Sequence, residues 1–215
     1  MKKMLFAELN IKTIDKKQTA EWLNDLDEKY WFWNEYRTCD LLALMTQSGE
    51  FDEESAKKNS SSQNDFFWTS FVPDFIKEYF EDNIFTWTKM KSRILVIRTQ
   101  AYKENKVHID CSPSAFHTIQ HKFRIVVQGN TNGLYFRTKR GDIWAPSTQK
   151  PFIIDGSWPH GMINDNPFPK YTIALGAPWA NCASYPGYNP LLFTPADQLP
   201  EAYENLFDFK KYKLK

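Results

Sequence analysis

From residue 92 onward, the sequence consists of short runs of β-branched and aromatic residues that are separated by turn-forming residues. The runs are RILVIRT at 93–99, FRIVVQ at 123–128, LYFRT at 134–138, FIID at 152–155 and YTIAL at 171–175. Asn132-Gly133 precedes the third run and is typical of a tight hairpin turn. Many short strands with little helix between them favour a β-sandwich or a jelly roll over a parallel α/β fold.

The residues before this region predict helices. Within 15–47, Trp22, Leu26 and Tyr30 recur every four residues, which is the spacing of one helix face. Pro73 suits the first turn of a second helix, because apolar residues follow it at helical spacing.

A polar stretch at residues 48–65 lies between the two predicted helices. It is rich in serine and has almost no large apolar side chain, which predicts a surface loop, with a lid over an active site as the alternative. We expect one domain over residues 1–215. It would comprise a helical N-terminal region at 1–91, a β core at 92–180 and a C-terminal extension at 181–215.

Charge and cysteine content argue against several classes of protein. The chain has 27 basic and 26 acidic residues, so no global field would attract it to nucleic acid or to an anionic membrane. The three cysteines have no CxxC spacing, which favours a reducing compartment over a disulfide framework. No apolar run approaches the roughly 18 residues that span a bilayer. We therefore expect a cytoplasmic protein without nucleic-acid or membrane partners.

The histidines are few enough to consider one by one: His108, His117, His121 and His160. His108 and Asp110 form an H-x-D triplet, and side chains at positions i and i+2 of a strand project from the same face. His160 comes at the end of the FIID run. Two imidazoles and one carboxylate on one face of an octahedron leave three positions open. This arrangement suits Fe(II) that must also bind a chelating co-substrate and oxygen.

The order of these parts resembles the catalytic barrel of the Fe(II)/2-oxoglutarate-dependent oxygenases. Segment 92–180 has the succession of strand, H-x-D triplet, short strands and second histidine. The run IIDGSWPHGMINDNPFPKYTIAL matches the family pattern of strand, turn, histidine, Asn-rich loop and basic strand. The resemblance implies an α+β, mainly β fold: a double-stranded β-helix, or jelly roll, with the N-terminal helices packed on it. It also implies that His108, Asp110 and His160 are the iron ligands.

The resemblance further implies where the co-substrate 2-oxoglutarate binds. In the family, a basic residue about ten positions after the distal histidine binds the C5 carboxylate, and that position is Lys170 in this chain. Arg124, on the FRIVVQ run, is a second candidate partner for a carboxylate. Lysine supplies a point charge and not the planar, two-toothed clamp of arginine. Ascorbate is a further cofactor candidate.

Two families within this group compete as the better match. The stretch Gly133–Trp179 is similar to the aspartyl/asparaginyl β-hydroxylases and to the prolyl 4-hydroxylases. The β-hydroxylases typically lack the carboxylate ligand and have arginine at the distal position, whereas this chain has Asp110 and Lys170. The resemblance therefore favours a prolyl 4-hydroxylase-like enzyme. Its substrate would be an amino-acid side chain in a peptide, in a protein or in a free amino acid, and Asp/Asn β-hydroxylation is the alternative.

Two other classes of function stay open. His117 and His121 are four residues apart, so on a helical turn they would share a face and could bind zinc together with His108 or Asp110. This arrangement lacks the adjacent glutamate of an HExxH site. The other class is a jelly-roll binding module without catalysis.

Overall fold

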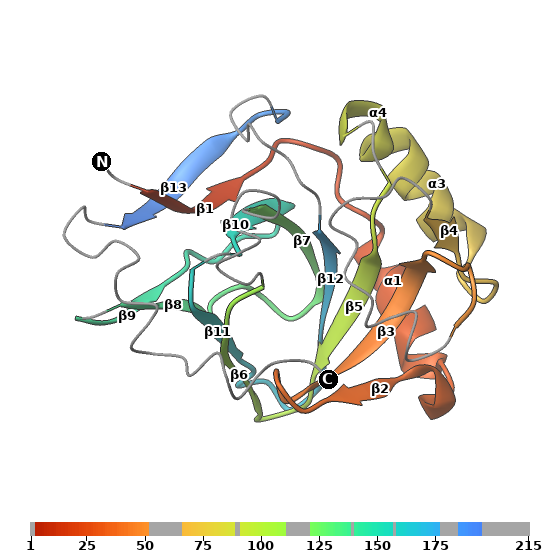
Figure 1. Ribbon diagram of the computed structural model, residues 1–215, viewed down its shortest axis with the longest axis horizontal. Coiled ribbons are helices and arrows are strands. Elements are labelled where there is room, and N and C mark those ends of the chain that lie inside the picture. Colours follow the sequence, from red (N-terminus) through yellow and green to blue (C-terminus); the bar gives the residue numbers. More distant parts are fainter. Residues whose placement is uncertain are drawn as a thin grey trace.

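The structure, a computed structural model, describes seven stretches of the chain (Figure 1). These stretches are residues 3–51, 66–88, 91–110, 121–138, 140–156, 158–176 and 185–194. Most of the predicted loop 48–65 and the whole of His117 lie outside the described residues.

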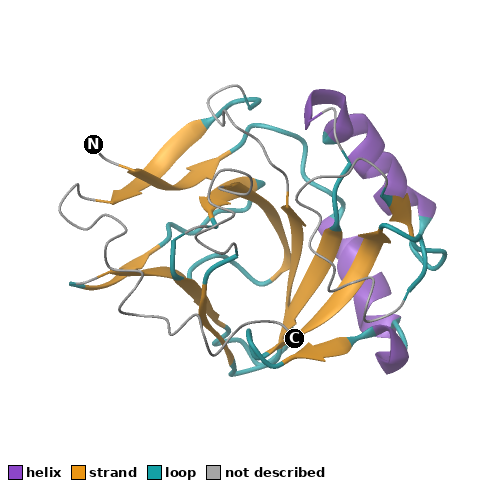
Figure 2. Ribbon diagram, viewed as in Figure 1, coloured by secondary structure: helices purple, strands orange, loops and turns teal. Residues whose placement is uncertain are grey.

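Strands outnumber helices throughout the described part of the chain (Figure 2). The helices are α1 (Lys16–Asp25), α3 (Asp74–Asn83) and α4 (Phe85–Thr88), with a 3-10 turn at Glu28–Tyr30. The strands are β1 (Lys3–Glu8), β2 (Phe32–Asn34), β3 (Cys39–Thr46), β4 (Phe67–Trp68), β5 (Ile94–Thr99), β6 (Glu104–His108), β7 (His121–Gln128), β8 (Leu134–Thr138), β9 (Gly141–Trp144), β10 (Phe152–Asp155), β11 (His160–Ile163), β12 (Lys170–Gly176) and β13 (Asn189–Thr194).

The described strands form two antiparallel sheets that face each other. The nine-stranded major sheet has the order β13-β1-β10-β7-β12-β5-β3-β2, with β4 paired to β3, and the four-stranded minor sheet has the order β6-β11-β8-β9. From β5 to β12 the chain passes back and forth between the two sheets, because β5, β7, β10 and β12 are in the major sheet and the intervening strands are in the minor sheet. This alternation is the double-stranded β-helix (Figure 1). The predicted fold class is confirmed.

The two faces of the major sheet have different neighbours. On β12, Tyr171, Ile173 and Leu175 belong to a large apolar cluster that also contains residues of the helices, such as Leu23 of α1 and Phe80 of α3. The helices therefore cover the outer face of the major sheet. The alternate residues of β12 point to the interior between the sheets, as expected from the two-residue repeat of a strand. None of the helices in the described part of the chain is long and apolar enough to cross a membrane.

The predicted strands of the β core are confirmed, and the core also contains β6, β9 and β11. The five predicted runs correspond to β5, β7, β8, β10 and β12. The sequence reasoning placed His160 at the end of the FIID strand, whereas in the structure β10 ends at Asp155 and His160 begins β11 in the other sheet. With only four residues, HGMI, β11 is too short to show a periodic pattern, and its pairing with β6 and β8 defines it.

The helix predicted over residues 15–47 is correct only for Lys16–Asp25. The later part contains the 3-10 turn and the hairpin β2–β3. Strand β3, CDLLALMT, is buried on both faces, because Leu42 packs toward the helices and Leu41 packs toward the interior. A strand that is buried on both faces lacks alternation, so its pattern cannot be distinguished from that of a buried helix. The N-terminal region is therefore not purely helical, and strands from both ends of the described chain extend the major sheet.

Candidate metal centre

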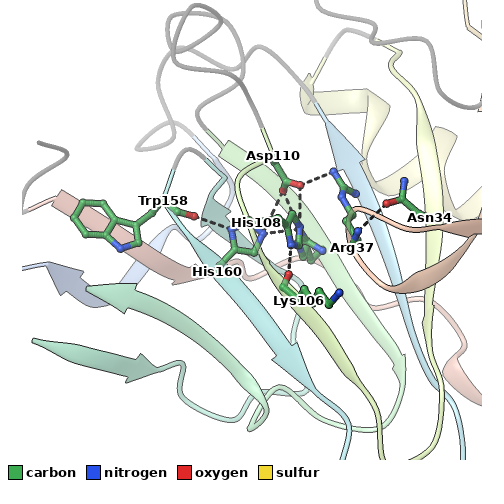
Figure 3. A network of polar contacts seen from close by, with 8 residues as sticks. Asn34, Arg37, Lys106, His108, Asp110, Trp158 and His160 are labelled. Atoms are coloured by element: carbon green, nitrogen blue, oxygen red, sulfur yellow. Dashed lines mark hydrogen bonds and ion pairs between the residues drawn. The ribbon is translucent and has the colours of Figure 1, made fainter. Parts of the chain in front are cut away.

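The structure brings His108, Asp110 and His160 together at one end of the barrel (Figure 3). Each offers a ligand atom, these atoms lie within 4.8 Å of one another, and all three residues are buried. His108 ends β6 and pairs directly with His160 at the start of β11. Asp110 lies just beyond β6, where its backbone N–H donates to the carbonyl of Gly156, 2.8 Å away. Strand pairing therefore positions His108 and His160, and a backbone hydrogen bond positions Asp110.

Backbone carbonyls orient both imidazole rings. Nδ1 of His108 lies 2.7 Å from the carbonyl oxygen of Lys106, and Nδ1 of His160 lies 2.8 Å from that of Trp158. A carbonyl can only accept a hydrogen bond, so each Nδ1 carries the hydrogen and each Nε2 presents a lone pair. Both Nε2 atoms are 3.5 Å from an oxygen of Asp110, and His108 Nε2 has no hydrogen-bond partner.

The protonation states of these groups suit a divalent cation. Burial lowers the pKa of His108, and burial together with the nearby His108 lowers the pKa of His160 to about 3, so both rings are neutral at neutral pH. Burial alone would raise the pKa of Asp110, but the charges of Arg37 and Arg124 outweigh this effect and hold its pKa well below the usual value. Two neutral imidazoles, one of them with an unpartnered buried Nε2, and one carboxylate form a donor set that fits Fe(II).

Two arginines hold the carboxylate of Asp110 from opposite sides. Arg37 Nη2 donates to Oδ1 at 2.8 Å, and Arg124 Nη2 donates to Oδ2 at 2.9 Å. Arg37 lies in the turn between β2 and β3, and its carbonyl accepts a hydrogen bond from the N–H of Lys106 in β6 at 2.9 Å. This hydrogen bond links the β2–β3 hairpin of the major sheet to β6, the edge strand of the minor sheet. Sequence reasoning missed Arg37, because nothing in the local pattern connects it to a residue 73 positions away.

The two predicted 2-oxoglutarate-binding residues lie at different levels of the barrel. Arg124 is opposite Ala174 of β12, beside Asp110, and its Nη2 is 3.4 Å from His160 Nε2. Lys170 begins β12, four residues earlier, which corresponds to about 13 Å along a strand. Arg124 is therefore next to the three clustered side chains, whereas the backbone of Lys170 lies further along the barrel and its side chain contacts Met162 and Ile163.

Lys170 is fully buried, and within the described residues it forms no ion pair. Its Nζ lies 3.5 Å from the sulfur of Met162 and 3.4 Å from the carbonyl oxygen of Ile163, which are weak partners for an ammonium. Burial lowers its pKa to about 8. A buried ammonium without an anion is unfavourable, so this position suits an anionic ligand.

Gly156 is a further residue that sequence reasoning missed. A Cβ at this position would lie 2.9 Å from Cγ of Lys122 and 3.1 Å from Cβ of Asp110. The only local signal was the Asp-Gly-Ser turn after the FIID strand. Glycine here allows β10 to approach the residue that presents the carboxylate.

Gly156→Ala is therefore expected to displace Asp110 and to weaken Fe(II) binding about 10- to 100-fold, the usual range for a neighbour that orients a ligand. The loss of unfolding free energy should be about 1–3 kcal/mol, the usual cost of overpacking, because Cγ of Lys122 and Cβ of Asp110 would have to shift. Fe(II) titration and thermal unfolding of the same preparation measure the two effects. Unchanged iron affinity would show that Asp110 does not depend on this close approach.

The residues of the zinc alternative are only partly placed. His117 lies outside the described residues, and for His121 the structure describes only the backbone, which begins β7 opposite Asp155. Within the described part of the chain, His108, Asp110 and His160 are the one group of three side chains that could hold a metal ion.

No protein-family model and no curated protein matches the sequence. Among solved structures, a prolyl-4-hydroxylase from Pseudomonas putida superposes with a TM-score of 0.50, over 82% of this chain and 93% of that protein, at 8% identity. A 2OG-Fe(II) oxygenase family oxidoreductase from Burkholderia pseudomallei superposes with a TM-score of 0.49, over 77% of this chain and 79% of that protein, at 9% identity. At such low identity the likeness to the prolyl-4-hydroxylase concerns the fold, and it agrees with the strand order described above.

Proposed function

We propose that this protein is an Fe(II)- and 2-oxoglutarate-dependent oxygenase. The observation that carries the proposal is the cluster of His108, Asp110 and His160 at one end of a double-stranded β-helix. Its two imidazoles are neutral and oriented, and its carboxylate is ionised. The fully buried Lys170 in the same barrel interior supports the proposal, because it forms no ion pair among the described residues.

Each of these residues would have a distinct role. His108, Asp110 and His160 would hold the iron, which when bound supplies the chemistry that activates oxygen. Lys170 would bind the C5 carboxylate of 2-oxoglutarate and so fix the direction in which the co-substrate lies. Arg37 and Arg124 would orient Asp110, since each already donates to one of its oxygens. Ascorbate would serve to keep the iron reduced.

The finer proposal is hydroxylation of an amino-acid side chain, with a prolyl 4-hydroxylase-like reaction favoured. The carboxylate ligand Asp110 and the lysine at position 170 support this choice over Asp/Asn β-hydroxylation. The fold does not by itself select a substrate. Peptides, proteins and free amino acids are therefore the substrate classes to compare.

Succinate release with Fe(II), 2-oxoglutarate and oxygen is expected and tests this proposal directly. The panel comprises proline peptides, Asp and Asn peptides and free amino acids, each with an iron-free control. We expect iron-dependent succinate release that at least one substrate class stimulates. The proline peptides are the class from which we expect this stimulation first. Tight binding of zinc without any succinate release would instead support the zinc alternative.

A further inference from the structure

We infer that Lys122 forms a second anion site, beside the proposed metal centre, that binds a carboxylate of the substrate. This inference rests on the proposed function and adds to it the chemical class of the substrate. Lys122 lies on β7 two residues before Arg124 and points to the same interior face, because Phe123 between them packs on the outer face. It is opposite Gly176 of β12, at the end of the barrel where Asp110 lies.

Lys122 is buried and lacks a partner among the described residues. Its exposed fraction is 8%, so more than nine-tenths of the residue is covered, yet it forms no hydrogen bond and no ion pair there. Its stem packs on Gly156, which also lies against Asp110. Burial lowers the pKa of Lys122 to about 8, which leaves the ammonium mostly protonated at neutral pH.

The charges around Lys122 are mostly of its own sign. The groups whose charges act on it are Asp110, Arg93, Arg37 and Arg124, and only Asp110 is acidic. Both oxygens of Asp110 already accept hydrogen bonds from Arg37 and Arg124. Arg93 makes other contacts. Without Arg93, three cations (Lys122, Arg37 and Arg124) still surround the single carboxylate of Asp110.

The proposed metal and co-substrate do not remove this excess of positive charge. Fe(II) brings two positive charges, and of the two negative charges of 2-oxoglutarate one is assigned to Lys170, so the positive charge beside Lys122 is not reduced. A further anion would lower the electrostatic energy of the site, since like charges in a low-dielectric interior repel strongly.

2-Oxoglutarate cannot occupy both cationic positions. Lys122 pairs with Gly176, whereas Lys170 lies six residues earlier on β12, which corresponds to about 20 Å along the strand. 2-Oxoglutarate has two carboxylates, and the proposed function uses one at Lys170 and the other at the metal, so neither is left for Lys122. The anion at Lys122 therefore belongs to another ligand. Its place beside His108, Asp110 and His160 makes that ligand the molecule on which the iron would act.

A carboxylate is the anion that amino-acid and peptide substrates carry. It can be the α-carboxylate of a free amino acid or the side-chain carboxylate of a peptide, and the experiment has one arm for each source. The first arm compares L-proline with L-prolinamide. The second compares an end-blocked Gly-Asp-Gly peptide with an end-blocked Gly-Asn-Gly peptide.

Binding is measured by anaerobic calorimetry on protein that holds Fe(II) and 2-oxoglutarate, so the readout does not depend on turnover. In at least one arm, the parent is expected to bind the acid about tenfold or more tightly than the amide, the scale of one desolvated charge pair. Lys122→Met keeps the unbranched stem against Gly156 and should abolish this preference. Lys122→Arg should retain part of it, and Lys103→Met, at an exposed lysine, should leave it unchanged.

Two results would overturn the inference: no preference for the acid by the parent in either arm, or an unchanged preference in Lys122→Met. Lys122→Gln provides the same comparison if the methionine variant does not fold. Succinate release is measured in parallel. Release without any preference for the acid contradicts only the role of Lys122. A preference that depends on Lys122, without any succinate release, contradicts only the proposed oxygenase activity.

Discussion

Replacing His160 with alanine is expected to abolish Fe(II) binding while the β-helix stays folded. In the structure, the Trp158 carbonyl oxygen fixes Nδ1 of His160, so that Nε2 is directed at the Asp110 carboxylate, 3.5 Å away. Without this imidazole, only His108 and Asp110 of the proposed ligand set remain as donors. The expected loss of affinity exceeds about 100-fold, because removal of a ligand should exceed the loss caused by its orienting neighbours.

Metal content and Fe(II) titration measure this effect, and circular dichroism checks the fold. The matched control is the double variant His117→Ala, His121→Ala, which should retain close to the parent amount of iron. If the double variant loses the metal and His160→Ala keeps it, the site belongs to the zinc alternative. If both variants keep the metal, the ion is held elsewhere.

Lys170→Ala is expected to raise the KM for 2-oxoglutarate by well over tenfold, with an iron content close to that of the parent. Its Nζ is fully buried, and its contacts among the described residues are a thioether sulfur and a carbonyl oxygen, so a bound carboxylate would be a much stronger partner. Loss of one partner of a desolvated ion pair costs about 2–5 kcal/mol. Iron content should not change, because the contacts of Lys170 are with Met162 and Ile163 and not with the three proposed ligands.

The variant Lys170→Met removes the charge of Lys170 and keeps an unbranched side chain that can pack in the same space. Cε of Lys170 would lie 3.0 Å from a Cβ at Gly129, so its stem fills a tight space that methionine can also fill. Without co-substrate, this variant is expected to be at least as stable as the parent, because it removes a buried charge that forms no ion pair among the described residues. Its melting temperature should no longer rise with 2-oxoglutarate, as it does in the parent.

Two further variants test the assignment of the anchor. Lys170→Arg keeps the charge, but the larger guanidinium would crowd the space beside Gly129, so partial activity is expected. Arg124→Ala should lower metal affinity more than co-substrate affinity, because Arg124 contacts Asp110. If Lys170→Ala binds 2-oxoglutarate as well as the parent and Arg124→Ala does not, then Arg124 is the anchor.

Local residue chemistry was sufficient to predict the central strands. The runs that became β5, β7, β8, β10 and β12 are rich in β-branched and aromatic residues, and turn-forming residues separate them. Such runs favour strands whichever neighbour they pair with. The H-x-D triplet was also readable, because His108 and Asp110 are close in the sequence, and strand geometry relates residues two positions apart.

Other features of the fold and of the site depend on pairing between segments that are distant in the sequence, so only the tertiary structure determines them. β3 lacks alternation because both of its faces are buried, and β11 is too short for any pattern, so their pairing partners determine them. The same holds at the site. Arg37 reaches Asp110 from the β2–β3 turn. Lys122 of β7 lies near the same carboxylate, because both side chains lie against Gly156. The sequence by itself determined the central strands and the candidate metal-binding side chains. The folding of one sheet over the other determined which charges surround them, because electrostatic interactions depend on distance in space and not on separation along the chain.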